Sequence, residues 1–130
     1  MLKSIITHRL FALGCFLLIL AGSSVPSNRI PSVFKLTPDK LIHCFEYGVY
    51  GFFLALWISS EFKSKSATTQ IILTLLIGWL CGMTDELYQH LTPGRTPDFY
   101  DWCLDAVGIV LGLLLFKGFI SKWPSVFTER

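Results

Sequence analysis

Residues 68–91, TTQIILTLLIGWLCGMTDELYQHL, decide the fold of this 130-residue chain. The first two thirds of the segment are apolar, whereas the last third contains Thr84, Asp85, Glu86 and Gln89. With its polar end included, the segment has the roughly 20 residues that a helix needs to cross a bilayer. Charged side chains inside a span are costly unless they pair or line a wet cavity. The segment therefore predicts a membrane helix whose polar end belongs to a site.

Three further apolar segments predict helices of the same kind. They cover residues 10–25, about 40–59 and about 98–120, and proline-rich or charged connectors separate them. The composition agrees, because only 15% of the residues are charged, against about 25% in a typical soluble domain. We therefore predict an all-α fold in a single domain, residues 1–130: a membrane bundle of four transmembrane helices.

The first apolar segment has two interpretations. It follows Lys3, His8 and Arg9 and ends in the small residues AGSS at 21–24, a pattern that a cleaved signal peptide would also show. We favour a retained helix, because three further spans need packing partners.

The distribution of basic residues predicts the orientation. Seven Lys and Arg residues fall on the side that holds both termini, and four fall on the other side. Because cytoplasmic loops carry the excess of basic residues, both termini are predicted to face the cytoplasm.

A net charge of +2 without a basic run gives no support for a nucleic-acid partner. The four cysteines fall one in each apolar segment and contain no CxxC pair, so we interpret them as packing residues.

The acidic residues gather on the other, extracytoplasmic side. Seven of the nine belong there: Asp39, Glu46, Asp85, Glu86, Asp98, Asp101 and Asp105. On the second span Asp39, His43 and Glu46 share one helical face, and on the fourth Asp98, Asp101 and Asp105 do the same. The pattern predicts a polar pocket at the extracytoplasmic face.

Two interpretations of this polar pocket stay open from the residues alone. It could be a structural lattice, in which Arg95 pairs with Glu86 or Asp101, and Asp39 and Asp98 cap their helices. It could instead bind a polar headgroup or perform acid–base chemistry on one, which the surplus of acid favours. His43, Glu46 and Glu86 are of suitable types for a metal, but no specific zinc spacing is present, so we expect no metal and no other cofactor.

Pairs of glycines predict close helix packing. Gly78 and Gly82 on the third span, and Gly108 and Gly112 on the fourth, each form GxxxG. This spacing lets helix backbones approach closely, and it suits either a compact bundle or a homo-oligomer.

Several separated motifs resemble the VanZ-like family. They are DKLIH at 39–43, FEY at 45–47, ELYQ at 86–89, PGR at 93–95, then Asp98, Asp101 and a glycine-containing last helix. The resemblance covers about 39–112. It implies a small bacterial membrane protein, in a family named for a component of a glycopeptide-resistance cluster linked to teicoplanin resistance. Where that family commonly has Asn, this chain has Asp105, and a protonated Asp105 would restore the donor of the amide.

Together these observations predict a protein of the bacterial cytoplasmic membrane that binds, or acts on, an amphiphile at the outer leaflet. The ligand would be a lipid headgroup, a lipid-linked cell-wall precursor or a lipophilic glycopeptide such as teicoplanin. Glu86 and His43 are the acid–base candidates. The predicted ligand-binding residues are Asp39, Lys40, Glu46, Gln89, Arg95, Asp98, Asp101 and Asp105, of which Lys40 and Arg95 would hold an anionic group. The alternatives are a membrane-embedded acid–base or metal-assisted enzyme on a lipid substrate and a structural partner in a larger complex.

Overall fold

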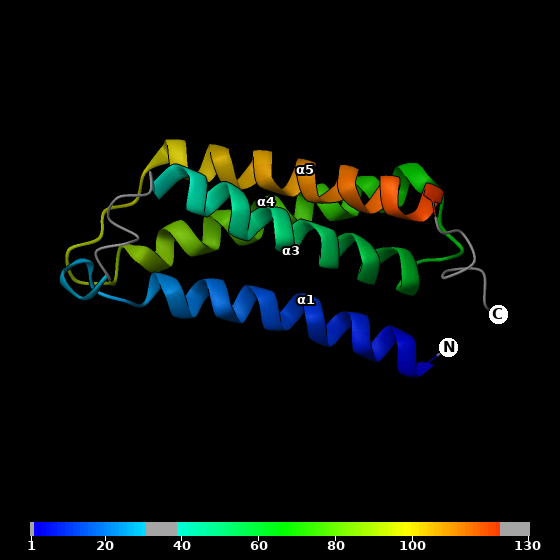
Figure 1. Ribbon diagram of the computed structural model, residues 1–130, viewed down its shortest axis with the longest axis horizontal. Coiled ribbons are helices and arrows are strands. Elements are labelled where there is room, and N and C mark those ends of the chain that lie inside the picture. The colour runs from blue at the N-terminus through cyan, green and yellow to red at the C-terminus, as the bar shows by residue number, and fades with distance from the viewer. Residues whose placement is uncertain (1, 31–38, 123–130) are drawn as a thin grey trace.

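A computed structural model describes residues 2–30 and 39–122, which form a bundle of long α-helices (Figure 1). The elements are α1 (Leu2–Ser23), the short 3-10 helix η1 (Ser27–Arg29), α3 (Asp39–Glu61), α4 (Ala67–Gln89) and α5 (Phe99–Lys122). Four of these helices are long and apolar enough to cross a membrane. The predicted all-α fold of four membrane helices is thus confirmed.

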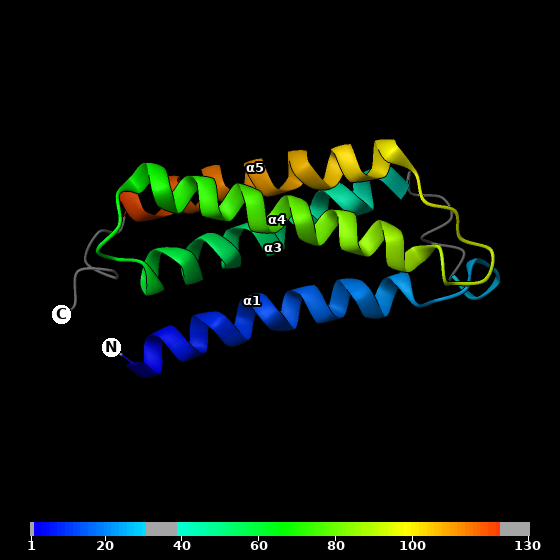
Figure 2. The ribbon, with the colours of Figure 1, turned by 180° about the vertical axis from the view of Figure 1, so that it is seen from behind.

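The helices run alternately up and down between two ends of the bundle (Figures 1 and 2). The beginning of α3 and the turn between α4 and α5 lie at one end, which we call the polar end. The beginning of α1 and the ends of α3 and α5 lie at the opposite end. Residues from the beginning of α3, the end of α4 and the beginning of α5 are therefore neighbours.

Polar side chains and a glycine set the helix boundaries. Ser66 caps α4 by accepting a hydrogen bond from the Thr69 amide at 3.1 Å. Asp98 caps α5 by accepting one from the Tyr100 amide at 2.8 Å, as predicted. Between α4 and α5, Gly94 has a φ of +75°, a conformation that glycine adopts without steric cost. This turn places the beginning of α5 against the end of α4.

Glycines bring α5 close to its two neighbours. A Cβ atom on Gly108 would lie 2.5 Å from the carbonyl oxygen of Cys44, and one on Gly112 would overlap the carbonyl oxygen of Gly48. On α4, a Cβ on Gly78 would lie 2.6 Å from the Ile109 side chain. Both GxxxG motifs therefore pack helices of the same chain, as in the compact-bundle alternative. A homo-oligomer through these faces stays a prediction.

Helix α1 packs along α3 as a member of the bundle. Ala12 and Ile19 are buried with α3 residues in the core, and the rings of Phe16 and Tyr50 stack 5.6 Å apart. At the end opposite the polar end, Arg9 pairs with Glu61 at 2.7 Å. These contacts are those that a retained helix would make, and the retention of α1 stays a prediction.

We expect the protein to keep α1 in the membrane. If the chain carries a C-terminal tag and is purified from bacterial membranes, its intact mass should include residues 2–23. Signal-peptide cleavage after the AGSS segment would instead give a shorter species, and finding that species alone would contradict the packing of α1 on α3.

Candidate functional site

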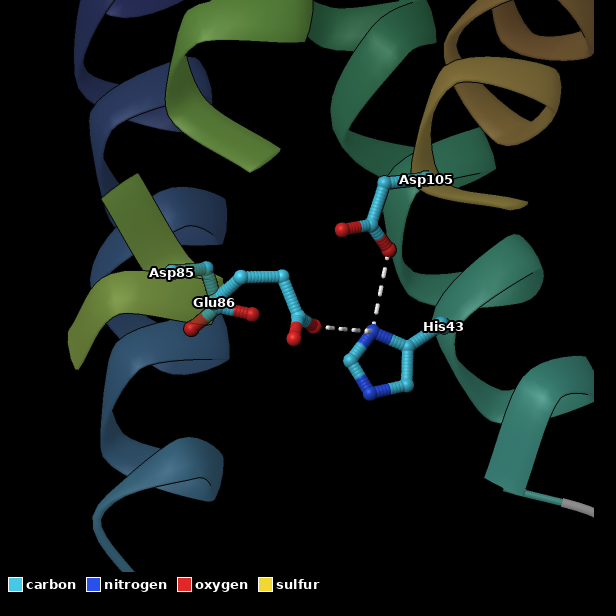
Figure 3. A group of neighbouring side chains, drawn as sticks. All are labelled: His43, Asp85, Glu86 and Asp105. Carbon is cyan, nitrogen blue, oxygen red and sulfur yellow. Dashed lines mark hydrogen bonds and ion pairs between the residues drawn. The ribbon is translucent and has the colours of Figure 1, made fainter. Parts of the chain in front are cut away.

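Four ionisable side chains from three helices meet inside the polar end. We call them the inner cluster: His43 of α3, Asp85 and Glu86 of α4, and Asp105 of α5. Figure 3 shows these side chains converging on one space. All four are buried, with exposed fractions of 4%, 0%, 6% and 0% in that order. One nitrogen or oxygen atom from each lies within 4.8 Å of those of the other three.

One hydrogen bond and one longer ion-pair contact within the inner cluster centre on His43. Its Nδ1 lies 2.9 Å from Oδ1 of Asp105 and 3.9 Å from Oε1 of Glu86 (Figure 3). The second carboxylate oxygen of Glu86 accepts a hydrogen bond from the Asp98 amide at 2.9 Å. An imidazole held by a carboxylate in this way has a fixed orientation, and Glu86 is tied to the beginning of α5.

Three carboxylate oxygens of the inner cluster are buried without a hydrogen-bond partner among the described residues. They are Oδ1 of Asp85, Oε1 of Glu86 and Oδ2 of Asp105. An unsatisfied buried polar group costs about 1–3 kcal/mol, and more when it is charged. The inner cluster therefore has spare acceptors for a ligand that donates hydrogen bonds or carries positive charge.

A second group, the outer rim, lies between the inner cluster and the surface. It consists of Lys40, Asp98 and Asp101. The ammonium of Lys40 donates to Oδ2 of Asp98 at 2.9 Å and to Oδ1 of Asp101 at 3.0 Å. The hydrogen bond from Lys40 lowers the pKa of the Asp98 carboxyl. Lys40 is thus balanced by two carboxylates, and the outer rim has no excess of positive charge.

Polar contacts also tie the polar end to α1. The amide nitrogen of the Gln89 side chain lies 3.3 Å from Oγ of Ser23 and 3.5 Å from Oδ2 of Asp85. The hydroxyl of Thr92 donates to the carbonyl oxygen of Ser23 at 2.9 Å. The Nε atom of Arg95 lies 3.5 Å from the carbonyl oxygen of Val25. Gln89 therefore links α1 to the inner cluster.

The structure brings most of the predicted site residues together. His43, Glu86 and Asp105 belong to the inner cluster, Lys40, Asp98 and Asp101 form the outer rim, and Gln89 contacts Asp85. Glu46 lies half-buried on α3, outside the four residues of the inner cluster. Asp39 begins α3, and its side chain lies outside the described ones. The pairing of Arg95 with Glu86 or Asp101 stays a prediction, as do the functional roles of all these residues.

Asp85 is the residue that sequence reasoning missed. It was recognised as an acid of the extracytoplasmic side, but it received no role in the site. The signal was its position on α4, because Gly78, Gly82, Asp85 and Gln89 recur at helical spacing on one face. All four are buried. An acid on the glycine face of a membrane helix must point into the bundle.

The arrangement has the parts for three kinds of chemistry. Carboxylate oxygens that lack partners can accept hydrogen bonds from hydroxyl or ammonium groups. An imidazole oriented by a carboxylate can accept and return a proton. One imidazole and three carboxylates are also ligand types that divalent metals accept in proteins.

Comparisons with known proteins agree with the resemblance seen in the sequence motifs. A family model described as VanZ/LLP1 matches residues 9–121. No curated protein and no solved structure matches the chain. The matched region includes residues 9–23 of α1, the whole inner cluster and all of α5 except Lys122. The chain therefore belongs to the VanZ/LLP1 family.

Proposed function

We propose that this chain binds an amphiphile, holding its headgroup at the polar end and its acyl chain against α3 and α5. The observation that carries the proposal is an apolar groove of about 520 Å³ on these two helices. Leu41 and Phe45 of α3 and Leu115 of α5 line it and are 61%, 73% and 67% exposed. Lys40 of the outer rim directly precedes Leu41 in the chain, so the groove starts at the end of α3 that carries the outer rim.

The length of the groove suits a hydrocarbon chain. Its lining on α3 extends from Leu41 to Phe53, which corresponds to roughly 18 Å at about 1.5 Å per residue. The residues that line the groove present almost no polar surface. A bound acyl chain would therefore leave no polar group without a hydrogen-bond partner. In a membrane protein such a surface is open to lipid, and a bound amphiphile reaches it without leaving the bilayer.

Charge and hydrogen bonding at the polar end favour a donor-rich headgroup. The inner cluster and the outer rim together contain five carboxylates against Lys40 and His43. Sugar hydroxyls and amino groups would supply donors to the spare carboxylate oxygens. A lipid headgroup, a lipid-linked cell-wall precursor and a lipophilic glycopeptide such as teicoplanin all offer such groups. If the ligand also carries a phosphate, Arg95 and Lys40 are the residues that would hold it.

The proposed location is the outer leaflet of the bacterial cytoplasmic membrane. Basic residues predominate at the end that holds both termini, which by the positive-inside rule faces the cytoplasm. The polar end then opens toward the cell wall, where lipid-linked precursors and glycopeptides meet the membrane.

Lipid analysis of the purified protein tests this function. We expect the wild-type chain, extracted in mild detergent, to retain an amphiphile that native mass spectrometry detects at a level well above its share of the membrane lipids. Asp101→Asn removes a charge from the outer rim, and Val49→Trp fills the groove, which Val49 lines. Each substitution should lower the retained amphiphile several-fold.

Glu61→Gln serves as the matched control. It makes the same kind of carboxylate-to-amide change at the opposite end of the bundle, where Glu61 pairs with Arg9. The amount of amphiphile that Glu61→Gln retains should equal the amount that the wild type retains. Equal lipid content in all four proteins, with the composition of the bulk membrane, would refute the proposed function.

Acid–base catalysis on the same amphiphile is a second candidate, and the His43–Asp105 contact favours it. A carboxylate at 2.9 Å from Nδ1 orients the imidazole so that its other nitrogen can exchange a proton with a substrate. Catalysis predicts a modified product that accumulates with wild-type protein and not with Glu86→Gln. Binding alone predicts unmodified amphiphile on the wild type.

A further inference from the structure

We infer that the inner cluster is a binding site for a divalent transition-metal ion, with one imidazole nitrogen and up to three carboxylate oxygens as ligands. The sequence shows no zinc spacing, so it predicts no metal site and keeps metal-assisted chemistry only as an alternative, with His43, Glu46 and Glu86 as residues of suitable type. The fold instead joins His43 and Glu86 to Asp85 and Asp105. Helix packing, and not a local motif, assembles this set.

The separations of the four side chains fit a single ion. Metal–ligand distances of about 2.0–2.4 Å place any two ligand atoms of one ion no more than about 4–5 Å apart. The four candidate ligand atoms satisfy this limit, since all lie within 4.8 Å of one another. Nδ1 of His43 and Oδ1 of Asp105, 2.9 Å apart, are spaced as adjacent ligands are. An ion would take the place of the proton between them.

The unpartnered oxygens are an independent observation that points to a cation. One oxygen each of Asp85, Glu86 and Asp105 lacks a hydrogen-bond partner among the described residues, and these side chains are at least nine-tenths buried. In Figure 3 the carboxylates of Glu86 and Asp105 point toward His43 and the space between the helices. A metal ion in that space would satisfy oxygens that otherwise cost stabilisation.

Charge balance gives a further reason. Three carboxylates buried together repel one another, and Lys40 of the outer rim already pairs with Asp98 and Asp101. A divalent ion would offset most of the negative charge of the inner cluster. The combination of one imidazole with three carboxylates narrows the choice of metal ion. Imidazole suits zinc and iron, whereas Mg²⁺ and Ca²⁺ prefer oxygen ligands alone. Zn²⁺, which accepts imidazole, and Mn²⁺, which accepts carboxylate oxygens, are the ions to test first.

Metal binding and amphiphile binding can be measured separately. Metal binding follows from the inner cluster alone, whereas the amphiphile also needs the groove and the outer rim. A chain that binds metal without amphiphile leaves the present inference standing and refutes the proposed function. A chain that retains amphiphile but takes up no metal refutes the present inference and leaves the proposed function standing.

The test uses the full-length chain in detergent, stripped with a chelator and then dialysed. Zn²⁺ or Mn²⁺ alone is titrated while heat release and Tm are followed, and metal content is measured by plasma mass spectrometry. We expect about one ion per chain and a higher Tm with metal. Asp85→Asn and Asp105→Asn should each weaken binding by at least tenfold, since each removes a charged ligand.

The same experiment includes a control variant and can give results that overturn the inference of a metal site. Glu61→Gln, at the opposite end of the bundle, should bind as the wild type does. Two variants are used so that poor folding of one, seen by size-exclusion chromatography, still leaves the other. The inference is overturned if the wild type takes up no stoichiometric metal, or if Glu61→Gln loses as much affinity as Asp85→Asn.

Discussion

Gly112→Ala should lower the stability of the purified chain by on the order of 1–3 kcal/mol, the usual cost of overpacking a core. A Cβ at this position would overlap the carbonyl oxygen of Gly48 and lie 2.6 Å from the backbone nitrogen of Phe52. These neighbours are backbone atoms, so no side-chain rotation relieves the contact. Helices α3 and α5 would have to separate, and thermal unfolding in detergent measures the loss as a lower Tm.

Gly118→Ala is the matched control on the same helix. Nothing lies within 4 Å of a Cβ built at Gly118, and alanine is favoured over glycine inside a helix by roughly 0.5–1 kcal/mol. Its Tm should equal or exceed that of the wild type. If both variants lost the same stability, close contact between α3 and α5 could not be the reason.

His43→Leu should be the most destabilising single change at the polar end, at about 3–5 kcal/mol, the range for breaking a buried charged pair. It removes the group that lies between Asp105 and Glu86 and leaves their buried carboxylates facing each other. We expect a large drop in Tm, measured with a chelator present so that a bound metal does not contribute.

The double variant His43→Leu/Asp105→Leu separates a structural role from a functional one. Replacing both members of a buried pair by apolar residues is often neutral, so the double variant should recover much of the stability that His43→Leu loses. If the inner cluster serves function, the recovered protein should still fail to retain amphiphile. A stable double variant that retains amphiphile as the wild type does would favour the structural lattice instead.

Much of the site was predictable because helical spacing is a local property. Asp39, His43 and Glu46 share a face of any helix through that segment, and so do Asp98, Asp101 and Asp105. The capping role of Asp98 was predictable for the same reason. Spacing says nothing, however, of how far a helix is rotated toward its neighbours. Glu46, one turn from His43, is therefore left outside the inner cluster, while Asp85 is included in it.

Composition and helical spacing were enough to assign the class of protein and the end at which its polar residues gather. Four apolar segments with few charges predict a bundle of membrane helices. In lipid, backbone N–H and C=O groups must form their hydrogen bonds with one another, and a helix does this within one segment. Which side chains meet depends on how the helices pack against one another. The glycines of α4 and α5 fix the rotation and the close approach of these helices, and that packing joins His43, Asp85, Glu86 and Asp105. Contacts between residues so distant in sequence depend on the packing of whole helices, which no local pattern encodes.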